Sequence, residues 1–338
     1  MNGRVNHQFR LAARPRGLVS RSDFDYVEEP IGDIEGDSFL VELDYISLDP
    51  AMRGWMNEGR SYLPPVGIGE VMRALGAGHI VESKHPGFAV GDHVVGTFGV
   101  QRFATTDGAG VIKVDPRVAP LPVYLGGLGV TGMTAYFGLL DVGQPQPGET
   151  VVVSGAAGAV GTIAGQIAAI KGCRVIGIAG GPAKCEYLTE ELGFDGAIDY
   201  KAEDVRASLK QHCPTGIDIY FDNVGGDILE AALARLARRA RIVICGAISQ
   251  YNADGKMKGP SNYMSLLVNR ARMEGFVVFD YSDRYLEAGI EMAGWMAEGK
   301  LRTREEIVEG LEAFPDALLK LFRGENMGKL VLKVGGGA

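Results

Sequence analysis

Apolar residues follow two different spacings along the stretch from about residue 150 to residue 280. Short runs rich in valine and isoleucine alternate with longer stretches in which apolar residues recur every three or four positions. The runs lie at 151–153, 174–179, 196–200, 217–222, 240–246 and 273–279. The helical stretches lie at 162–171, 183–192, 204–212 and 226–238. Strands that alternate with helices predict an α/β fold with a doubly wound parallel sheet and right-handed crossovers.

The first 130 residues have a different pattern of apolar residues. Short runs with β-strand character, such as 39–43 and 78–83, are broken by glycine and proline, which is typical of an irregular β-domain. Near the C-terminus, 324–334 reads as a turn followed by a strand. We therefore expect one domain over 1–130, a second over 131–300, and a return of 301–338 to the first.

The turn after the run at 151–153 consists of small residues. A pyrophosphate can approach the N-terminus of the following helix only where the backbone is uncovered, which requires small residues at fixed positions. Here these positions hold Ala156, Gly158 and Gly161. Ala156 replaces the usual first glycine, so the motif is a variant. An ordinary strand-to-helix turn is the alternative, but the alternating strands and helices that follow favour a Rossmann-type dinucleotide-binding domain.

Charge at the end of the second strand indicates which dinucleotide binds. NAD-binding domains place a carboxylate about 20 residues past the glycines, where it would repel a 2′-phosphate. Here that position holds Gly180-Gly181-Pro182, with Lys184 three residues past Gly181. Lys184 and Tyr200 can meet a phosphate, and the pattern favours NADPH. A lysine on a helix surface and a half-buried tyrosine at a strand end are the alternatives.

Composition narrows the class of protein. The chain has 338 residues, 46% of them hydrophobic, which is enough for two domains. Its net charge of −8, without a run of lysine or arginine, argues against nucleic acid or an anionic membrane as the main partner. No N-terminal stretch resembles a signal peptide and none approaches the roughly 18 apolar residues of a membrane span. We expect a cytoplasmic protein.

The cysteines and histidines lack the spacing of a metal site. The four cysteines show no CxxC pattern, and the five histidines are isolated from one another. We therefore expect reduced, structural thiols, no disulfide framework and no bound metal.

Six segments, taken in order, resemble one family of enzymes. They are 69–92, TGMTAY at 131–136, GAAGAVG at 155–161, FDNVGG at 221–226, CGAISQYN at 245–252 and GENMGK at 324–329. They are similar to the zinc-free medium-chain dehydrogenase/reductases, in the branch of prostaglandin reductase, leukotriene 12-hydroxydehydrogenase, plant alkenal double-bond reductases and curcumin reductase. The resemblance implies a GroES-like first domain beside the Rossmann domain.

The resemblance also implies a reaction. Zinc-dependent relatives carry a catalytic cysteine, a Gly-His-Glu sequence and a four-cysteine lobe, none of which occurs here. Hydride addition to a conjugated carbon–carbon double bond needs no metal, because hydrogen bonds can stabilise the charge that reaches the oxygen. NADPH-dependent reduction of α,β-unsaturated aldehydes or ketones is the leading interpretation. An NADPH quinone reductase and an NADPH-binding protein with little turnover are the alternatives.

The family pattern assigns cofactor contacts residue by residue. The expected set is Met133, Thr134, Ala156, Gly158, Ala159, Val160, Gly161, Gly180, Lys184, Tyr200, Asn223, Cys245, Ala247, Ile248, Ser249, Tyr251, Phe276, Val277, Val278 and Asn326. For Met133, Cys245 and Phe276, the alternative is that the side chains only pack in the core. For Asn326, the alternative is a structural Asx-turn.

The residue that supplies a proton is less clearly marked. Some plant relatives have a tyrosine a few residues before the sixth strand, where this chain has Val268. Tyr251 and Tyr62 are the candidates, with Tyr263 third, and water or the ribose hydroxyl of the cofactor are alternatives.

Two further expectations concern partners. The segments 53–75 and 251–268, rich in methionine, tyrosine and proline, suggest a small apolar substrate. By analogy, the sixth strand at 273–279 suggests a homodimer.

Overall fold

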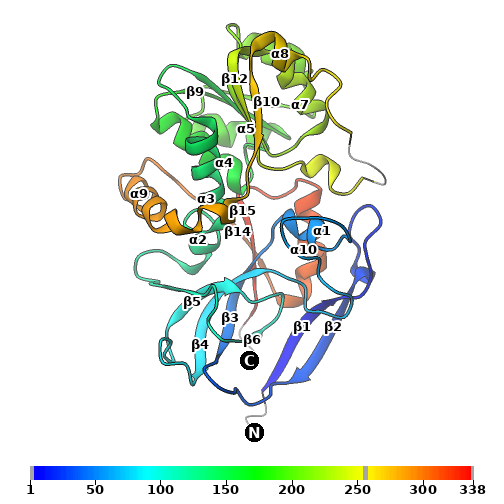
Figure 1. Ribbon diagram of the computed structural model, residues 1–338, viewed down its shortest axis with the longest axis vertical. Coiled ribbons are helices and arrows are strands. Elements are labelled where there is room, and N and C mark those ends of the chain that lie inside the picture. Colours follow the sequence, from blue (N-terminus) through cyan, green and yellow to red (C-terminus); the bar gives the residue numbers. More distant parts are fainter. Residues whose placement is uncertain (1–3, 254–257, 336–338) are drawn as a thin grey trace. The chain divides into compact units, whose positions relative to one another are not determined.

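The structure is a computed structural model that describes residues 4–253 and 258–335. Within these ranges the chain forms two compact units. The first contains residues 4–126, 305–326 and 330–335. The second contains 127–253, 258–304 and 327–329. The chain therefore leaves the first unit, builds the second and returns, and Figure 1 colours this path from blue to red.

The second unit is built on a six-stranded parallel sheet. Its strands are β8 (Thr150–Ser154), β9 (Arg174–Ala179), β10 (Gly196–Asp199), β11 (Ile217–Asp222), β12 (Leu236–Ile244) and β13 (Arg272–Gly275). The spatial order is β10-β9-β8-β11-β12-β13, with every neighbouring pair parallel. This order is that of a Rossmann sheet, with the switch point between β8 and β11. The predicted doubly wound sheet is confirmed (Figure 1).

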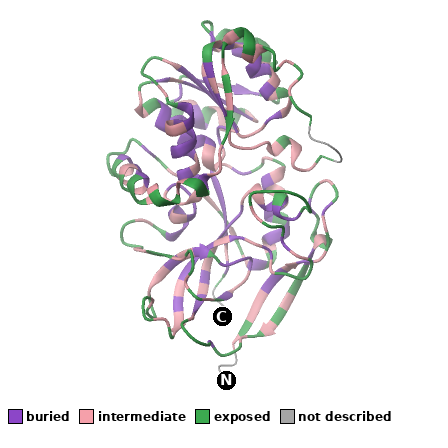
Figure 2. Cartoon of the chain, in the orientation of Figure 1, coloured by how far each residue is buried: buried purple, intermediate pink, exposed green. Residues whose placement is uncertain are grey.

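Helices cover both faces of this sheet. They are α3 (Val130–Phe137), the π-helical turn η2 (Gly138–Gly143), α4 (Ala159–Ile170), α5 (Pro182–Glu186), the π-helical turn η3 (Tyr187–Glu191), α6 (Val205–His212), α7 (Gly226–Leu233), α8 (Ser265–Asn269) and α9 (Tyr285–Ala297), with short 3-10 turns η4 (Ile248–Gln250) and η5 (Val278–Arg284). Because side chains alternate along a strand, Val151 and Val153 of β8 join a core with α4, whereas Val152 joins another with α6 and α7. Figure 2 shows α4 as mainly buried, and β8, β9 and β11 are buried along almost all of their length.

Three predicted boundaries in the second unit are wrong. The helix expected over 226–238 ends at Leu233, and β12 starts at Leu236 rather than at residue 240. Arg239, with φ of 66°, lies where the pairing of β11 and β12 shifts register, and this irregularity hides the early start of the strand. The last strand also ends at Gly275, four residues earlier than expected, because the chain turns into η5.

The first unit contains two sheets. Its elements are β1 (Val5–Leu11), η1 (Arg21–Asp23), β2 (Phe24–Pro30), β3 (Phe39–Ser47), α1 (Ala51–Trp55), β4 (Leu75–Ser83), β5 (His93–Thr97), β6 (Phe103–Thr106), β7 (Ile112–Val114), α2 (Leu121–Leu125), β14 (Glu305–Glu309), η6 (Leu311–Ala313), α10 (Phe314–Phe322) and β15 (Lys329–Lys333). β1 pairs with β2, and the other strands form the order β14-β15-β3-β4-β5-β7 with β6 beside β3.

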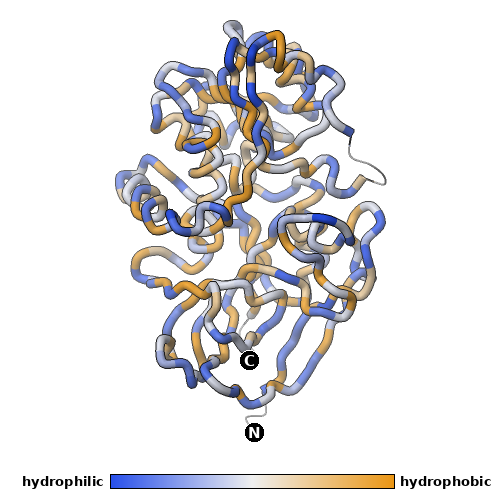
Figure 3. Tube along the Cα trace, in the orientation of Figure 1, coloured by the Kyte–Doolittle hydropathy of each residue, from blue (hydrophilic) through white to orange (hydrophobic). Residues whose placement is uncertain are grey.

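The sequence pattern explains which strands of the first unit are covered. β1 and β2 mix hydrophobic and hydrophilic positions (Figure 3) and bury about one face. The returning strand β15 is buried along most of its length and pairs antiparallel with β3. The C-terminal segment thus adds a strand to the sheet of the first unit.

Candidate dinucleotide-binding site

The small-residue turn joins β8 to α4 in a tight backbone path. Gly155 has φ of 58°, which favours glycine, and Gly158 is the residue before the first turn of α4. A Cβ on Gly161 would lie 2.3 Å from the carbonyl oxygen of Gly155, so only glycine lets the helix lie so close to the turn. The N-terminus of α4, opening with the partly exposed Ala159 and Val160, is therefore reachable by a phosphate.

The alanine in the variant motif is accommodated by a glycine on the next strand. Ala156 is fully buried, and its N–H donates to the carbonyl oxygen of Ile178 at 3.0 Å. Its methyl group lies 2.9 Å from the point that a Cβ on Gly177 would occupy. The methyl group at position 156 thus fills space that a glycine on β9 leaves open.

The two residues that follow β9, Gly180 and Gly181, have no side chains, and β10 pairs with β9 beside them. A Cβ on Gly180 would lie 2.8 Å from Cε1 of Tyr200. Gly181, with φ of 97°, caps α5, and its N–H donates to Oδ1 of Asp199 at 2.8 Å. Lys184 lies in α5 and is partly exposed, and Tyr200 is 43% exposed. The structure thus gathers Gly180, Lys184 and Tyr200 around one turn.

Asp222 ties the ends of β8 and β11 together at the switch point. Its Oδ1 accepts hydrogen bonds from the Ser154 hydroxyl at 2.9 Å, the Tyr220 hydroxyl at 3.1 Å, and the N–H groups of Val224 and Gly225 at 3.0 and 2.9 Å. The side chain is only 1% exposed, and Oδ2 has no hydrogen-bond partner. Burial raises the pKa of this carboxyl above its ordinary value, although the four bonds to Oδ1 oppose that rise.

Asn223 completes the link between the two strands. Its Nδ2 donates to the carbonyl oxygen of Ser154 at 2.7 Å, and its backbone N–H donates to the Ser154 hydroxyl at 2.9 Å. The Asn223 side chain therefore lies at the crevice where an open parallel sheet binds its ligand.

The segment from Cys245 to Tyr251 folds back over the same crevice. The N–H groups of Cys245 and Gly246 donate to the carbonyl oxygen of Asp222 at 2.9 and 3.0 Å, and the Ser249 hydroxyl donates to that of Val224 at 2.6 Å. The Ala247 N–H donates to the Tyr251 hydroxyl oxygen at 3.1 Å. Burial raises the pKa of the Cys245 thiol to about 12, so this group stays a thiol at neutral pH.

Other expected contacts lie in the interior of the second unit. Met133 is buried in its core, and the Thr134 hydroxyl donates to the carbonyl oxygen of Val130 within α3. A Cβ on Gly138 would lie 2.5 Å from the Phe276 ring, which packs against the same core. Val278 is buried as well. Packing thus accounts for much of the Met133 and Phe276 surface, and their contact with a cofactor stays a prediction.

The returning segment reaches the phosphate turn inside the second unit. Gly328 N–H donates to the carbonyl oxygen of Ala157 at 2.8 Å, and a Cβ on Gly328 would lie 2.2 Å from the Arg304 carbonyl oxygen. Asn326, which is 6% exposed, comes just before residues 327–329, the part of the returning segment that belongs to the second unit.

The candidate Tyr62 belongs to the first unit and is 53% exposed.

Sequence reasoning named the motifs but missed three supporting residues. Asp222 is part of the FDNVGG segment, but no role was predicted for it from the sequence. Its place at the end of a predicted strand could have indicated one. Gly177 and Asp199 gave no signal, because their importance depends on which strands are neighbours.

Other possible sites contribute little. In the described ranges, no group of three or more His, Cys, Asp or Glu could hold a metal ion, and the four cysteines are unpaired thiols. Within the same ranges, no helix has the length and apolarity needed to cross a membrane. The expected substrate segment 251–268 includes residues 254–257, which lie outside the described residues.

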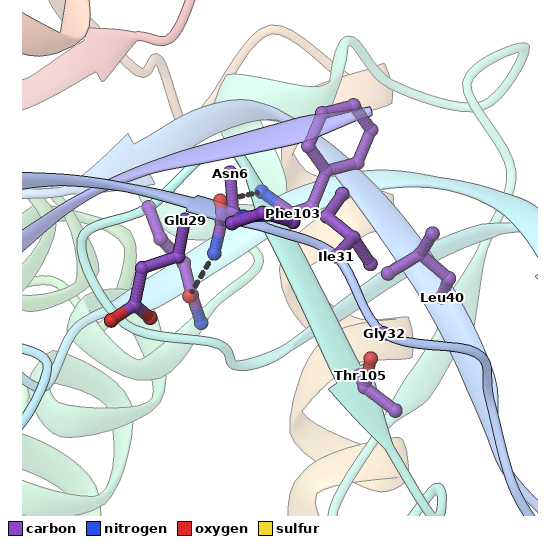
Figure 4. Close-up of a pocket in the computed structure, with 9 residues that line it drawn as sticks. Asn6, Glu29, Ile31, Gly32, Leu40, Phe103 and Thr105 are labelled. Carbon is purple, nitrogen blue, oxygen red and sulfur yellow. Dashed lines mark hydrogen bonds between the residues drawn. The ribbon is translucent and has the colours of Figure 1, made fainter. Parts of the chain in front are cut away.

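A cavity of about 300 Å³ occurs in the first unit, beside β1 and β2 (Figure 4). The polar side chains that line it already have hydrogen-bond partners. Asn6 donates to Gln101 and accepts from the Phe103 N–H, and Glu29 accepts from Arg10 at 2.6 Å. These groups stabilise the local strands, and they offer no arrangement for chemistry.

The Rossmann strand order, the glycine turn at α4 and the side chains gathered at the switch point define a dinucleotide-binding oxidoreductase. Two family models match the chain: the N-terminal domain of oxidoreductase over residues 7–114 and zinc-binding dehydrogenase over 159–293. The chain belongs to the medium-chain dehydrogenase/reductase family, in its zinc-free branch.

Relatives cover nearly the whole chain. The NADPH-dependent curcumin reductase of Escherichia coli is 43% identical over 98% of this chain and 97% of its own length. The NADP(+)-dependent 2-alkenal reductase of Nicotiana tabacum is 43% identical over 87% of each protein. The crystal structure of CurA from Vibrio vulnificus in complex with NADPH has a TM-score of 0.94 and 43% identity, covering 98% of this chain and all of the other.

Proposed function

We propose that this protein uses NADPH to reduce the carbon–carbon double bond of α,β-unsaturated aldehydes or ketones. The observation that carries the proposal is the turn at Gly180 and Gly181, which has no acidic residue of its own and is bordered by Lys184 and Tyr200. The carboxylate beside it, that of Asp199, accepts the Gly181 N–H. Two relatives at 43% identity are an NADPH-dependent curcumin reductase and an NADP(+)-dependent 2-alkenal reductase, and both names fit a conjugated carbonyl substrate.

The residues at the switch point fit such a cofactor. The turn of Gly158 and Gly161 would hold the pyrophosphate, Lys184 and Tyr200 the 2′-phosphate, and Asn223 the ribose on the adenosine side. When bound, NADPH supplies a hydride to the β-carbon of the substrate. The remaining predicted contacts extend this set along the segment from Cys245 to Tyr251 and along Phe276 to Val278.

Reduction at the β-carbon leaves negative charge on the conjugated oxygen. A hydrogen-bond donor aimed at that oxygen lowers the barrier, and a phenol is suited to the task. Tyr251 and Tyr62 are our candidates. The Tyr251 oxygen accepts from the Ala247 N–H, and this bond holds the hydroxyl in place.

A three-way assay tests the proposed reaction. NADPH oxidation is followed with a 2-alkenal, with a quinone and with no substrate, using NADPH deuterated at nicotinamide C4. We expect turnover with the alkenal and deuterium on the β-carbon of the saturated product. Fast turnover with the quinone alone would favour the quinone reductase alternative, and no turnover with either would favour a binding role.

A chelator-treated sample provides the control for a metal. Activity on the alkenal should survive dialysis against a strong chelator, since polarisation of the carbonyl is assigned to hydrogen bonds. Activity that is lost on dialysis and restored by zinc would contradict the proposed mechanism.

A further inference from the structure

Lys201 lies against the same turn as Tyr200 and was not among the expected cofactor contacts. It stands two residues after the end of β10, and its side chain approaches Gly180, the residue that follows β9. A Cβ on Gly180 would lie 2.9 Å from Cε of Lys201, which carries the ammonium group one bond further on. Lys201 is exposed, so this ammonium group is accessible to a ligand.

The acids nearest to Lys201 in the chain, Asp199 and Glu203, accept hydrogen bonds from groups other than the Lys201 ammonium. Oδ1 of Asp199 accepts from the backbone N–H groups of Gly181 at 2.8 Å and of Lys201 at 3.0 Å. Glu203 accepts from the Asp199 N–H at 2.9 Å and from the Ser208 hydroxyl at 2.7 Å. Within the part of the chain that the structure describes, no carboxylate pairs with the Lys201 ammonium. The charge of Lys201 is therefore not neutralised by a neighbouring acid.

Two cations thus border the turn from separate elements. Lys184 belongs to α5, which follows β9, and Lys201 follows β10. Gly180 has no side chain between them, and any Cβ there would meet both the Tyr200 ring and the Lys201 side chain. A dianionic phosphate on this turn would gain from both charges, whereas a ribose hydroxyl would gain little.

We propose that Lys201 binds the 2′-phosphate of NADPH and, with Lys184, determines the preference for NADPH over NADH. The inference rests on the proposed use of NADPH. Asp199 acts here as a positioning residue: its hydrogen bonds hold Gly181 and Lys201 together.

Binding measurements on the full chain test the role of Lys201 without relying on turnover. Dissociation constants for NADPH and NADH are measured by fluorescence titration for wild type, Lys201→Ala, Lys201→Arg and the control Lys210→Ala, an exposed lysine on α6. Because the contact is exposed and screened, we expect Lys201→Ala to weaken NADPH binding by about three- to tenfold. NADH binding should change by less than about twofold, since no 2′-phosphate is present.

Further readouts separate a charge effect from a structural one. Lys201→Arg should keep most of the NADPH affinity, Lys210→Ala should behave as wild type, and the salt dependence of NADPH binding should fall in Lys201→Ala. Equal losses for both dinucleotides would show a structural role and overturn the inference. A full NADPH preference in Lys201→Ala would overturn it too. A wild type that binds both dinucleotides equally would overturn the cofactor assignment itself, and this inference with it.

Discussion

The methyl group of Ala156 and the missing side chain of Gly177 are complementary. The two positions face each other across β8 and β9, and a Cβ on Gly177 would lie 2.9 Å from the Ala156 methyl group and 2.7 Å from Cδ1 of Leu188. The variant phosphate turn therefore depends on a glycine 21 positions further along the chain. Ala156 adds a methyl group to the turn, and Gly177 on β9 leaves the space that this methyl group needs.

This complementarity predicts coupled effects on stability. Gly177→Ala should lower the free energy of unfolding by about 1–3 kcal/mol, because the added methyl group overfills a buried site. Adding Ala156→Gly should recover part of that loss by removing one of the two methyl groups. Chemical unfolding of both single variants and the double variant gives the coupling energy. Strictly additive effects would contradict direct contact between the two positions.

A second prediction concerns Lys184. If its ammonium binds the 2′-phosphate, the contact contributes roughly 1.5–3 kcal/mol, so Lys184→Ala should raise the Michaelis constant for NADPH by about one to two decades. The Michaelis constant for NADH should remain nearly unchanged. Steady-state kinetics with both dinucleotides measures the effect, and equal losses would remove Lys184 from the phosphate site.

The alternation of strands and helices and the phosphate turn could be predicted because their signals are local. The apolar run at 151–153 and the glycines that follow are read from neighbouring residues. The group around Gly180 could be predicted only in part: Lys184 is three residues from Gly181, whereas Lys201 meets the turn because β10 lies beside β9. Similarly, the burial of Asp222 depends on the pairing of β8 with β11. Neighbours across a sheet are set by topology, which spacing alone does not reveal.

The third prediction follows from the buried Asp222. Its pKa is raised above the ordinary value of 3.8 by burial, so the folded protein binds this proton more tightly than the unfolded chain does. The stabilising contribution of Asp222 is thus full at low pH and is lost as pH rises through the folded-state pKa. Wild type should gain stability relative to Asp222→Asn as pH falls from about 7 to about 4.5.

Urea unfolding at the two pH values measures this difference, with Asp283→Asn, an exposed substitution in the same unit, as the control. The opposite trend, in which wild type loses stability relative to Asp222→Asn as pH falls, would show that the hydrogen bonds to Oδ1 outweigh burial.

The fourth prediction is a homodimer formed at the edge of the parallel sheet. β13 is the last strand in the sheet order, and α8, which precedes it in the chain, exposes apolar side chains: Leu267 is 69% and Val268 66% exposed. An open strand edge with an apolar neighbour favours pairing with a second copy. Light scattering after size exclusion should give twice the mass of one chain. Leu267→Lys should shift it towards one chain, whereas Leu286→Lys on α9 should not.

The last prediction identifies the group that holds the developing oxyanion. Tyr251→Phe and Tyr62→Phe each keep the ring and remove only the hydroxyl. Loss of a donor to the oxyanion typically lowers turnover about 100- to 1000-fold, whereas loss of apolar lining mainly raises the Michaelis constant. Single-turnover kinetics with a 2-alkenal and NADPH measures the chemical step directly, and a drop beyond about tenfold in one variant would identify that tyrosine as the donor.

Tyr251→Phe needs a second readout because its hydroxyl oxygen also accepts the Ala247 N–H. Losing that bond would loosen the segment from Cys245 to Tyr251 and weaken NADPH binding, so the dissociation constant is measured alongside the rate. A slower chemical step with unchanged NADPH affinity assigns Tyr251 to the oxyanion. Weaker NADPH binding with an unchanged chemical step assigns it to holding the segment. Near-normal rates in both single variants and in the double variant would leave the cofactor ribose hydroxyl or water as the proton source.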